Sequence, residues 1–382
     1  MIFLRLNILL ALVLTASVVQ AQTDGLPGQL QHKIDSLFKA YTTKRTPGYA
    51  IGIVKNRQII YRHGYGLANL DYTLPITPKS AFDIASVSKQ FTGACIALLI
   101  MDGKLRLDMP ASRFIPELAK YKDTIRIEHL IYNTSGITDY YQLPRASDRS
   151  WVTFDYFDND ECIRTSLRQD TLAFMPGTKW DYCNVNFMLL ARIVEKVSGE
   201  PFSAFARRRL FLPLGMKQTM VNDDATEIIQ DRAIPYNPRT KEYVDAYRKS
   251  GFDVKYGSGW IQHARNSPHY GGSGISTTVN DLIKWEENFF SKQFGGEQFY
   301  QLMHRTQRFR HDMDNQAFGL YRGTFKGSTY WAWDGADYGV SAQIMRFTDQ
   351  QVAIIVLSNI GNGDSAKKAQ QIADLLIAGK QL

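Results

Sequence analysis

The stretch Ala81–Gly93, AFDIASVSKQFTG, places a serine and a lysine three residues apart at the start of an apolar segment. If a helix begins near Ser86, Ser86 and Lys89 share one face of it. The free N–H groups at a helix N-terminus favour an oxyanion beside Ser86. A serine hydroxyl becomes a nucleophile when a base takes its proton, and Lys89 can be that base or tune another. The spacing also fits a capping serine and a surface lysine, so it needs support from elsewhere.

That support comes from Phe174–Gly199, FMPGTKWDYCNVNFMLLARIVEKVSG, where Tyr182 and Asn184 follow a Pro-Gly turn and precede a predicted amphipathic helix. A cation beside a tyrosine favours the phenolate, which can act as a general base. An asparagine amide can bind both a lysine and a substrate carbonyl. A half-buried loop tyrosine remains the alternative interpretation of Tyr182.

The totals describe an ordinary globular chain with a sizeable core. It has 382 residues, 44% of them hydrophobic and 21% charged, with a formal net charge of +8. Its densest basic run, Arg207–Arg209, is predicted to be a solvated helix face rather than a nucleic-acid site. Three cysteines, Cys95, Cys162 and Cys183, form neither a disulfide framework nor a metal pattern. We therefore expect no cofactor, no metal and no nucleic-acid partner.

Residues 1–21 have the pattern of a secretory signal peptide. Arg5 precedes an apolar run, and small residues lie one and three positions before a cut after Ala21. No later stretch reaches the roughly 18 apolar residues of a membrane span. We expect a product of residues 22–382 that is exported, periplasmic or extracellular, with no stable membrane span after cleavage.

The order of elements predicts an α+β fold in which an antiparallel sheet is flanked by helices. Runs rich in β-forming residues occur near both ends of the chain, and mostly helical patterns lie between them. We expect one domain, with a sheet part at about 28–85 and 270–382 and a mostly helical insert at about 105–265. Residues 235–275, rich in Gly, Tyr and Asn, are predicted to be long surface loops.

Several segments, in this order, resemble the serine beta-lactamase and penicillin-binding protein superfamily, closest to its class C and esterase-like branch. The resemblance covers about residues 30–375 and implies the beta-lactamase/transpeptidase-like fold. It rests on residues 85–93 (ASVSKQFTG), 125–140 (IRIEHLIYNTSGITDY), 174–199, 211–220 (FLPLGMKQTM), 271–285 (GGSGISTTVNDLIKW) and 333–359.

The resemblance also implies roles for single residues. Ser86 would be the nucleophile that accepts the acyl group. Lys89 and Tyr182 would form the base system, with either as the proton acceptor. Asn184 would orient substrate, and the main-chain N–H groups of Ser86 and Ala336 would form the oxyanion hole.

Three departures from the family pattern matter. Cys183 replaces the usual serine between the tyrosine and the asparagine, and Asn133 replaces a histidine in a loop. Trp333-Asp334-Gly335 stands where relatives that act on penicillins usually have Lys-Thr-Gly. Trp333 cannot attract a substrate carboxylate, and Asp334 would repel one if it faced the site. Residues alternate along a strand, so Asp334 can instead lie on the face opposite Trp333 and Gly335.

We therefore expect a serine hydrolase that forms an acyl-enzyme on a small ester, amide or peptide, with Asn184 and residues 333–336 in contact with substrate. The principal interpretation is esterase-like or amidase-like. The alternative is a penicillin-binding, cell-wall D-amino-acid peptidase or a beta-lactamase, with Arg322 as a candidate to hold a carboxylate. A binding or sensor protein without turnover is a further possibility, which the complete set of reactive residues disfavours.

Overall fold

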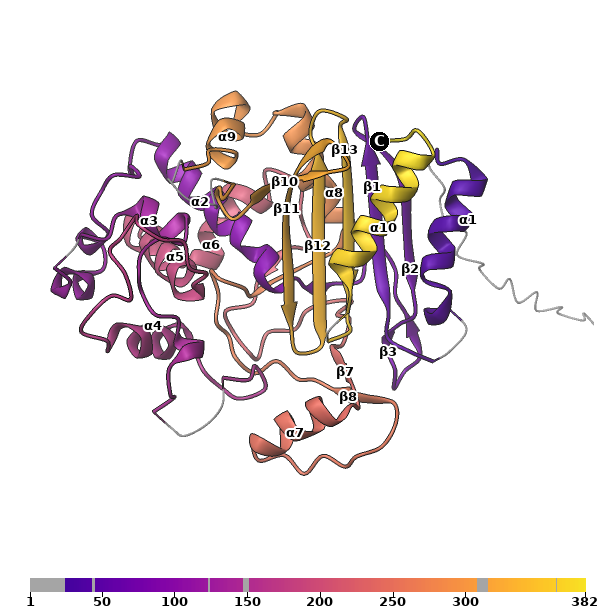
Figure 1. Cartoon of the computed structure of the whole chain (residues 1–382), viewed down its shortest axis with the longest axis horizontal. Helices are drawn as coiled ribbons and strands as arrows, with labels where there is room; N and C mark the ends of the chain where they lie inside the picture. Colours follow the sequence, from indigo (N-terminus) through magenta and orange to yellow (C-terminus); the bar gives the residue numbers. More distant parts are fainter. Residues whose placement is uncertain (1–24, 43–44, 123, 147–150, 308–314, 362) are drawn as a thin grey trace, which may run out of the picture.

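We analysed a computed structural model of the chain, which describes residues 25–42, 45–122, 124–146, 151–307, 315–361 and 363–382. The predicted signal peptide, residues 1–21, lies outside the described residues. Within them, strands from both ends of the chain join in one six-stranded antiparallel sheet, in the order β10-β11-β12-β13-β1-β2 (Figure 1). The strands are β1 (Tyr49–Lys55), β2 (Gln58–Tyr65), β10 (Tyr321–Phe325), β11 (Ser328–Asp337), β12 (Val340–Phe347) and β13 (Val352–Ser358).

The joint between the two ends of the chain is the pairing of β1 with β13, in which Tyr49 lies opposite Ser358 and Lys55 opposite Val352. Both strands are rich in β-branched residues, which pack well on a pleated surface. Every residue of β13 is buried, because helices cover both faces of the sheet. The predicted meeting of the terminal strands is therefore present.

Residues of β1 alternate between two apolar layers. Ile51 and Ile53 pack in the layer of α1 (Gly28–Leu37) and α10 (Ser365–Ala378). Ala50 and Val54 face the opposite layer, which contains α8 (Val279–Ser291). This is the period of two expected for a strand buried on both sides. In Figure 1, α10 crosses in front of β12 and β13 and lies beside α1.

The second layer continues into the largely helical part of the chain, shown on the left of Figure 1. Its central helix is α2, of which residues 89–99 are all buried. Such a helix is apolar on every side, as is typical of the middle of a core. The helices of this part are α2 (Lys89–Met101), α3 (Ile127–Ile131), α4 (Asn159–Leu167), α5 (Asn184–Ser198), α6 (Phe202–Ala206) and α9 (Gly296–Met303).

Short strands complete the connections around this core. A three-stranded sheet has the order β5-β9-β6, and β3-β4 and β7-β8 are two-stranded. Their bounds are β3 (Leu67–Asn69), β4 (Leu74–Pro75), β5 (Phe82–Asp83), β6 (Met220–Val221), β7 (Tyr236–Pro238), β8 (Trp260–Gln262) and β9 (Ile275–Thr277). No helix among the described residues is long and apolar enough to cross a bilayer.

Two local predictions need correction. The helix expected to begin near Ser86 begins at Lys89, and Ser86 lies in a preceding 3₁₀ turn, Ala85–Ser88. The chain enters this turn with Ala85 at φ 44°, where a side-chain oxygen of Asp83 accepts the N–H of Ala85 at 2.8 Å. That bond substitutes for a helical one and delays the start of the α-helix.

Residues 235–275 are not simply surface loops, as predicted. They contain β7, β8 and α7 (Lys241–Lys249), and much of the later part is buried, including His263, Arg265 and His269. In Figure 1, α7 lies below the main sheet. Polar residues are buried here because hydrogen bonds satisfy them, which a search for apolar periodicity does not detect.

Candidate active site

Ser86 and Lys89 meet at the junction of the 3₁₀ turn and α2. Nζ of Lys89 and Oγ of Ser86 are within hydrogen-bonding distance, 3.1 Å, and the Lys89 side chain is fully buried. The position one helical turn after Ser86 thus places an amine under the hydroxyl. A buried amine without a carboxylate partner favours its neutral form.

Tyr182, in the loop before α5, and Asn184, the first residue of α5, reach the same point. Oγ of Ser86 and the hydroxyl of Tyr182 are 2.6 Å apart, and Oδ1 of Asn184 accepts from Nζ of Lys89 at 2.8 Å. The Tyr182 hydroxyl also donates to Oδ1 of Asn184 at 3.2 Å. The structure therefore brings together all four residues that the two motifs singled out, although 93 to 98 positions separate the motifs' reactive residues along the chain.

The protonation states follow from burial. Burial lowers the pKa of Lys89 to about 7, and the negative charges of Asp139 and Asp334 oppose this shift. Burial also raises the pKa of Tyr182 well above its usual range, and its hydrogen bond with Ser86 only partly opposes this. Near neutral pH the lysine can lose its proton while the phenol keeps its own.

The hydrogen bonds of Lys89 suit a neutral amine. Besides Ser86, Nζ contacts Oδ1 of Asn184 and, at 2.6 Å, the main-chain carbonyl of Gly272. These two oxygens can only accept hydrogen bonds, so a neutral amine directs its two N–H bonds to them. Its lone pair then faces Oγ of Ser86 and can take the hydroxyl proton. Tyr182 remains a donor on the other side of the same oxygen.

Asp139 positions this group, and the sequence motifs did not identify it. Its Oδ2 accepts both the main-chain N–H of Asn184 and, at 3.1 Å, the Nδ2 group of the same residue. This fixes the amide so that Oδ1 of Asn184 faces Lys89. Burial raises the pKa of Asp139, while the N–H groups of Asn184 and Tyr141 oppose that rise. The signal that could have identified Asp139 is its position near the end of residues 125–140, one of the segments that resemble the family.

Asn133, one of the three departures from the family pattern, has a supporting role. It is buried, has a φ of 56°, and its Oδ1 accepts the N–H of Cys183 at 3.3 Å and the Nδ2 group of Asn186 at 3.2 Å. Its main-chain carbonyl accepts the N–H of Asp181. Asn133 thus holds the loop that carries Tyr182. Cys183 is buried, and burial raises the pKa of its thiol.

The strand β11 passes close to Ser86 because residue 335 is a glycine. A Cβ atom on Gly335 would lie 2.4 Å from the carbonyl oxygen of Ile84 and 2.9 Å from the nitrogen of Ser86. Both are main-chain atoms, so any larger residue would push the strand away. The next residue, Ala336, lines the same pocket as Ser86. The oxyanion hole formed by the main-chain N–H groups of Ser86 and Ala336 stays a prediction.

The rest of the third motif lies around this contact. Trp333 is 5% exposed, and its ring stacks beside that of Tyr182, with centroids 6.4 Å apart and an interplanar angle of 27°. It therefore supports Tyr182 from within the core and does not line the pocket. Asp334 is exposed and also outside the pocket lining. Its charge nevertheless raises the pKa of both Lys89 and Tyr182.

The pocket over Ser86 is small, about 190 Å³. Drug-sized ligands usually occupy cavities of roughly 300–1,000 Å³, so this one fits about one amino-acid residue. No lysine or arginine is among the described residues that line it. The residues that line the pocket are Ala85, Ser86, Tyr140, Tyr141, Tyr182, Asn184, Met188, His269, Ser273, Ala336 and Asp337.

A buried charged group lies behind one wall of this pocket. Arg265 forms an ion pair with Asp83 and donates to the carbonyl of His269 at 3.1 Å and to Oγ of Ser273 at 3.2 Å. Burial and the charge of Arg265 hold the pKa of His269 well below its usual range, so this histidine is neutral. Burial raises the pKa of Asp337 to about 6, while Arg265 opposes that rise. Asp337 thus carries a negative charge at neutral pH.

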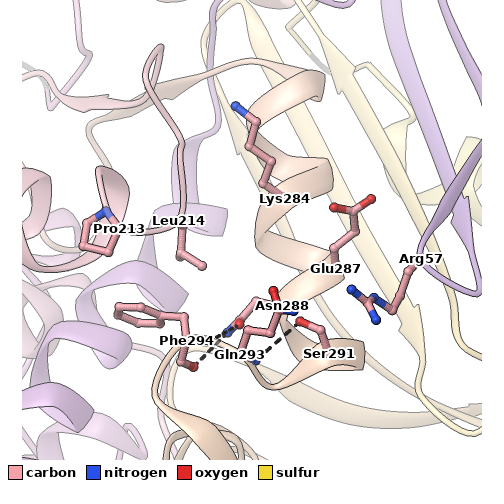
Figure 2. A pocket seen from close by; sticks show the side chains of 9 residues that line it. All are labelled: Arg57, Pro213, Leu214, Lys284, Glu287, Asn288, Ser291, Gln293 and Phe294. Atoms are coloured by element: carbon pink, nitrogen blue, oxygen red, sulfur yellow. Dashed lines mark hydrogen bonds between the residues drawn. The ribbon is translucent and has the colours of Figure 1, made fainter.

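Larger hollows elsewhere lack these reactive groups. Figure 2 shows one of about 400 Å³ beside α8, with Arg57, Lys284 and Glu287 among its lining residues. Another, of about 620 Å³, lies between α4 and the segment at Pro116. Neither contains a serine, lysine and tyrosine in mutual contact, so the chemistry assigns the site to the smaller pocket. No group of three or more His, Cys, Asp or Glu residues in the described part of the chain could hold a metal ion.

Comparison with known proteins agrees with this geometry. The beta-lactamase family model matches residues 34–377. The D-aminopeptidase of Gluconobacter oxydans is 26% identical over 335 residues, which cover 86% of this chain and 59% of that protein. The D-aminopeptidase of Brucella canis is 28% identical over 322 residues, covering 84% and 58%. The chain thus spans less than two thirds of the length of these relatives.

Solved structures share the fold. The octameric penicillin-binding protein homologue from Pyrococcus abyssi matches with a TM-score of 0.76 and 22% identity, covering 92% of this chain and 77% of that one. The D-amino acid amidase from Ochrobactrum anthropi, in complex with D-phenylalanine, matches with a TM-score of 0.75 and 20% identity, covering 92% and 99%. The predicted fold class is confirmed.

Proposed function

The chain belongs to the beta-lactamase family of serine hydrolases, and on that premise we propose that it is an amidase or aminopeptidase that releases D-amino acids from small amides or short peptides. The observation that carries the proposal is the pocket over Ser86, which fits one residue and has no lysine or arginine in its described lining. A substrate carboxylate gains no partner there, whereas an uncharged amide does not need one.

The proposed reaction begins with neutral Lys89. It takes the proton of Ser86 as Oγ attacks the carbonyl carbon, and the N–H groups of Ser86 and Ala336 stabilise the oxyanion. The tetrahedral intermediate then collapses, the C–N bond breaks, and the leaving nitrogen receives a proton from the Tyr182 hydroxyl. The proton held by Lys89 restores Tyr182. Water, deprotonated by the same groups, cleaves the acyl ester and frees Ser86.

The relatives favour this proposal over an esterase-like one. The relatives from Gluconobacter oxydans and Brucella canis are D-aminopeptidases, and among the solved structures with this fold is a D-amino acid amidase. The argument for an esterase was Trp333 in the third motif. Since Trp333 packs behind Tyr182 instead of lining the pocket, it selects no ester group directly. Export through residues 1–21 stays a prediction.

Hydrolysis of a matched pair, D-alanine p-nitroanilide and L-alanine p-nitroanilide, tests the proposal. We expect turnover of the D-isomer at a higher kcat/KM, lost in Ser86→Ala. Ser88→Ala is the control, because the Ser88 hydroxyl contacts the N–H of Ile275 at 3.1 Å and not Lys89. Exposure to a short-chain p-nitrophenyl ester and to a fluorescent penicillin, followed by intact mass, completes the set. Ester turnover without anilide turnover would instead support an esterase, and a stable penicillin adduct a penicillin-binding peptidase.

A further inference from the structure

Asp337 is a carboxylate inside the reactive pocket that the mechanism above does not use. It is the last residue of β11 and follows directly after Ala336, whose N–H is proposed to hold the substrate oxyanion. A strand advances about 3.3 Å per residue, so Asp337 lies about one residue's length beyond the reacting carbonyl. In an amino-acid amide the charged group close to that carbonyl is the α-ammonium group, which is bonded to the adjacent Cα atom.

Asp337 does not form an ion pair with its buried neighbour, Arg265. Arg265 directs its guanidinium to Asp83, His269 and Ser273. Oδ1 of Asp337 accepts the main-chain N–H of Tyr338 at 2.7 Å, and the Thr153 side chain also forms a hydrogen bond with this carboxylate. A carboxylate has about four acceptor sites, so Asp337 can accept further donors. A partly buried carboxylate in a pocket without a cationic side chain attracts a cation from solution.

Two tyrosine rings share the pocket with this carboxylate. Tyr140 and Tyr141 line the same pocket and stack with centroids 4.4 Å apart. Asp337 lines this pocket as well, and its negative charge raises the pKa of the Tyr141 hydroxyl. Aromatic faces attract ammonium groups, and tyrosine is among the better rings for this. The neutral His269 adds no competing positive charge.

We propose that Asp337, together with the rings of Tyr140 and Tyr141, forms a subsite that binds the free α-ammonium group of the substrate's acyl residue. This inference rests on the proposed function. It adds that the amidase is selective for amino-acid amides whose α-amine is unblocked. A blocked or absent amine would leave the Asp337 carboxylate buried against the substrate without a partner.

The experiment compares two substrates with the same leaving group, D-alanine p-nitroanilide and propionyl p-nitroanilide, which lacks only the amine. In the wild-type protein we expect kcat/KM to favour the amine by about 10- to 100-fold. Asp337→Asn should reduce that ratio to near one, and Asp337→Glu should retain part of it. Asp334→Asn is the matched control, because it removes a solvent-facing carboxylate from the same strand and should keep the ratio.

The outcomes separate this inference from the proposed function. Equal rates for the two substrates in the wild-type protein, or an unchanged ratio in Asp337→Asn, would overturn the ammonium subsite while leaving an amidase. Hydrolysis of neither anilide would overturn the proposed function itself. If Asp337→Asn fails to fold, N-acetyl-D-alanine p-nitroanilide tests the subsite on the unchanged protein. The proposal requires its kcat/KM to fall at least as far as that of the propionyl compound.

Discussion

The main-chain carbonyl of Gly272 accepts a 2.6 Å hydrogen bond from Nζ of Lys89, although the two residues are 183 positions apart. A carbonyl cannot donate, so this contact fixes the direction of one N–H bond of the amine. Together with Oδ1 of Asn184, it orients Lys89 towards Ser86. The segment around Gly272, just before β9, thus helps to orient the catalytic base.

Gly272→Ala should displace this carbonyl. A Cβ atom at residue 272 would lie 3.1 Å from the main-chain oxygen of Asn184, so the segment must shift by a few tenths of an ångström. We expect kcat/KM for D-alanine p-nitroanilide to fall by about 10- to 100-fold, because small misplacements of a catalytic group are costly. Gly28→Ala, where the added Cβ would meet nothing within 4 Å, is the control. Equal activity in the two variants would show that the carbonyl does not orient Lys89.

The acylation rate should depend on pH through Lys89. Its pKa is lowered to about 7, mainly by burial, with Asp139 and Asp334 opposing. Because the neutral amine is the proposed base, kcat/KM should rise about tenfold per pH unit below 7 and level off above it. Propionyl p-nitroanilide is the appropriate substrate, since it has no amine to titrate. A profile measured from pH 5 to 9 that is flat, or still rising at pH 9, contradicts a neutral Lys89.

Asp139→Asn should move that inflection to lower pH. The Asp139 charge raises the pKa of Lys89, so its removal lowers that pKa further, by about one unit. The asparagine keeps an oxygen that can accept from Asn184, so the hydrogen-bonding framework is largely retained. The measurement is the same pH profile. Asp102→Asn, at the far end of α2 and paired with Arg209, should leave the inflection in place. A shift to higher pH in Asp139→Asn would refute this account of the Lys89 pKa.

Trp333→Ala should destabilise the protein strongly. The indole is 5% exposed and packs against the rings of Tyr182 and Tyr321. We expect a loss of about 3–5 kcal/mol in the free energy of unfolding measured with urea. Trp333→Phe should lose clearly less. Tyr72→Ala, at a side chain that is 78% exposed, should change stability by less than about 0.5 kcal/mol. A Trp333→Ala variant as stable as Tyr72→Ala would place the indole outside the core.

Much of the fold and the reactive centre could be predicted from the sequence, because both have local signals. The terminal strands are runs of β-branched residues, and the spacing of Ser86 and Lys89 is a property of one helical turn. Tyr182 and Asn184 lie at the start of a strongly periodic helix. These patterns are contiguous, so no knowledge of the tertiary structure was required to find them.

The supporting groups have no such signal. Asp139 acts through a hydrogen bond to Asn184, 45 positions away, and Arg265 is buried through its ion pair with Asp83, 182 positions away. Apolar periodicity detects burial of hydrophobic side chains, not of satisfied polar ones. Residues 235–275 were therefore predicted to be surface loops. Asp337 was missed for a related reason, since its position in the pocket depends on how closely Gly335 lets β11 approach Ser86.

The pairing of β1 with β13 affects how the chain folds during its synthesis. β1 is synthesised early, but it can pair with β13 only after residues 352–358 have been made. Contacts so distant in sequence form slowly, and a partial chain exposes an unpaired strand edge. A nascent chain that ends before Ser328 also has Ser86 without Ala336 or Asp337. Ser86 is thus present for most of translation, but its pocket is complete only after residues 328–382 have been made and have folded around it.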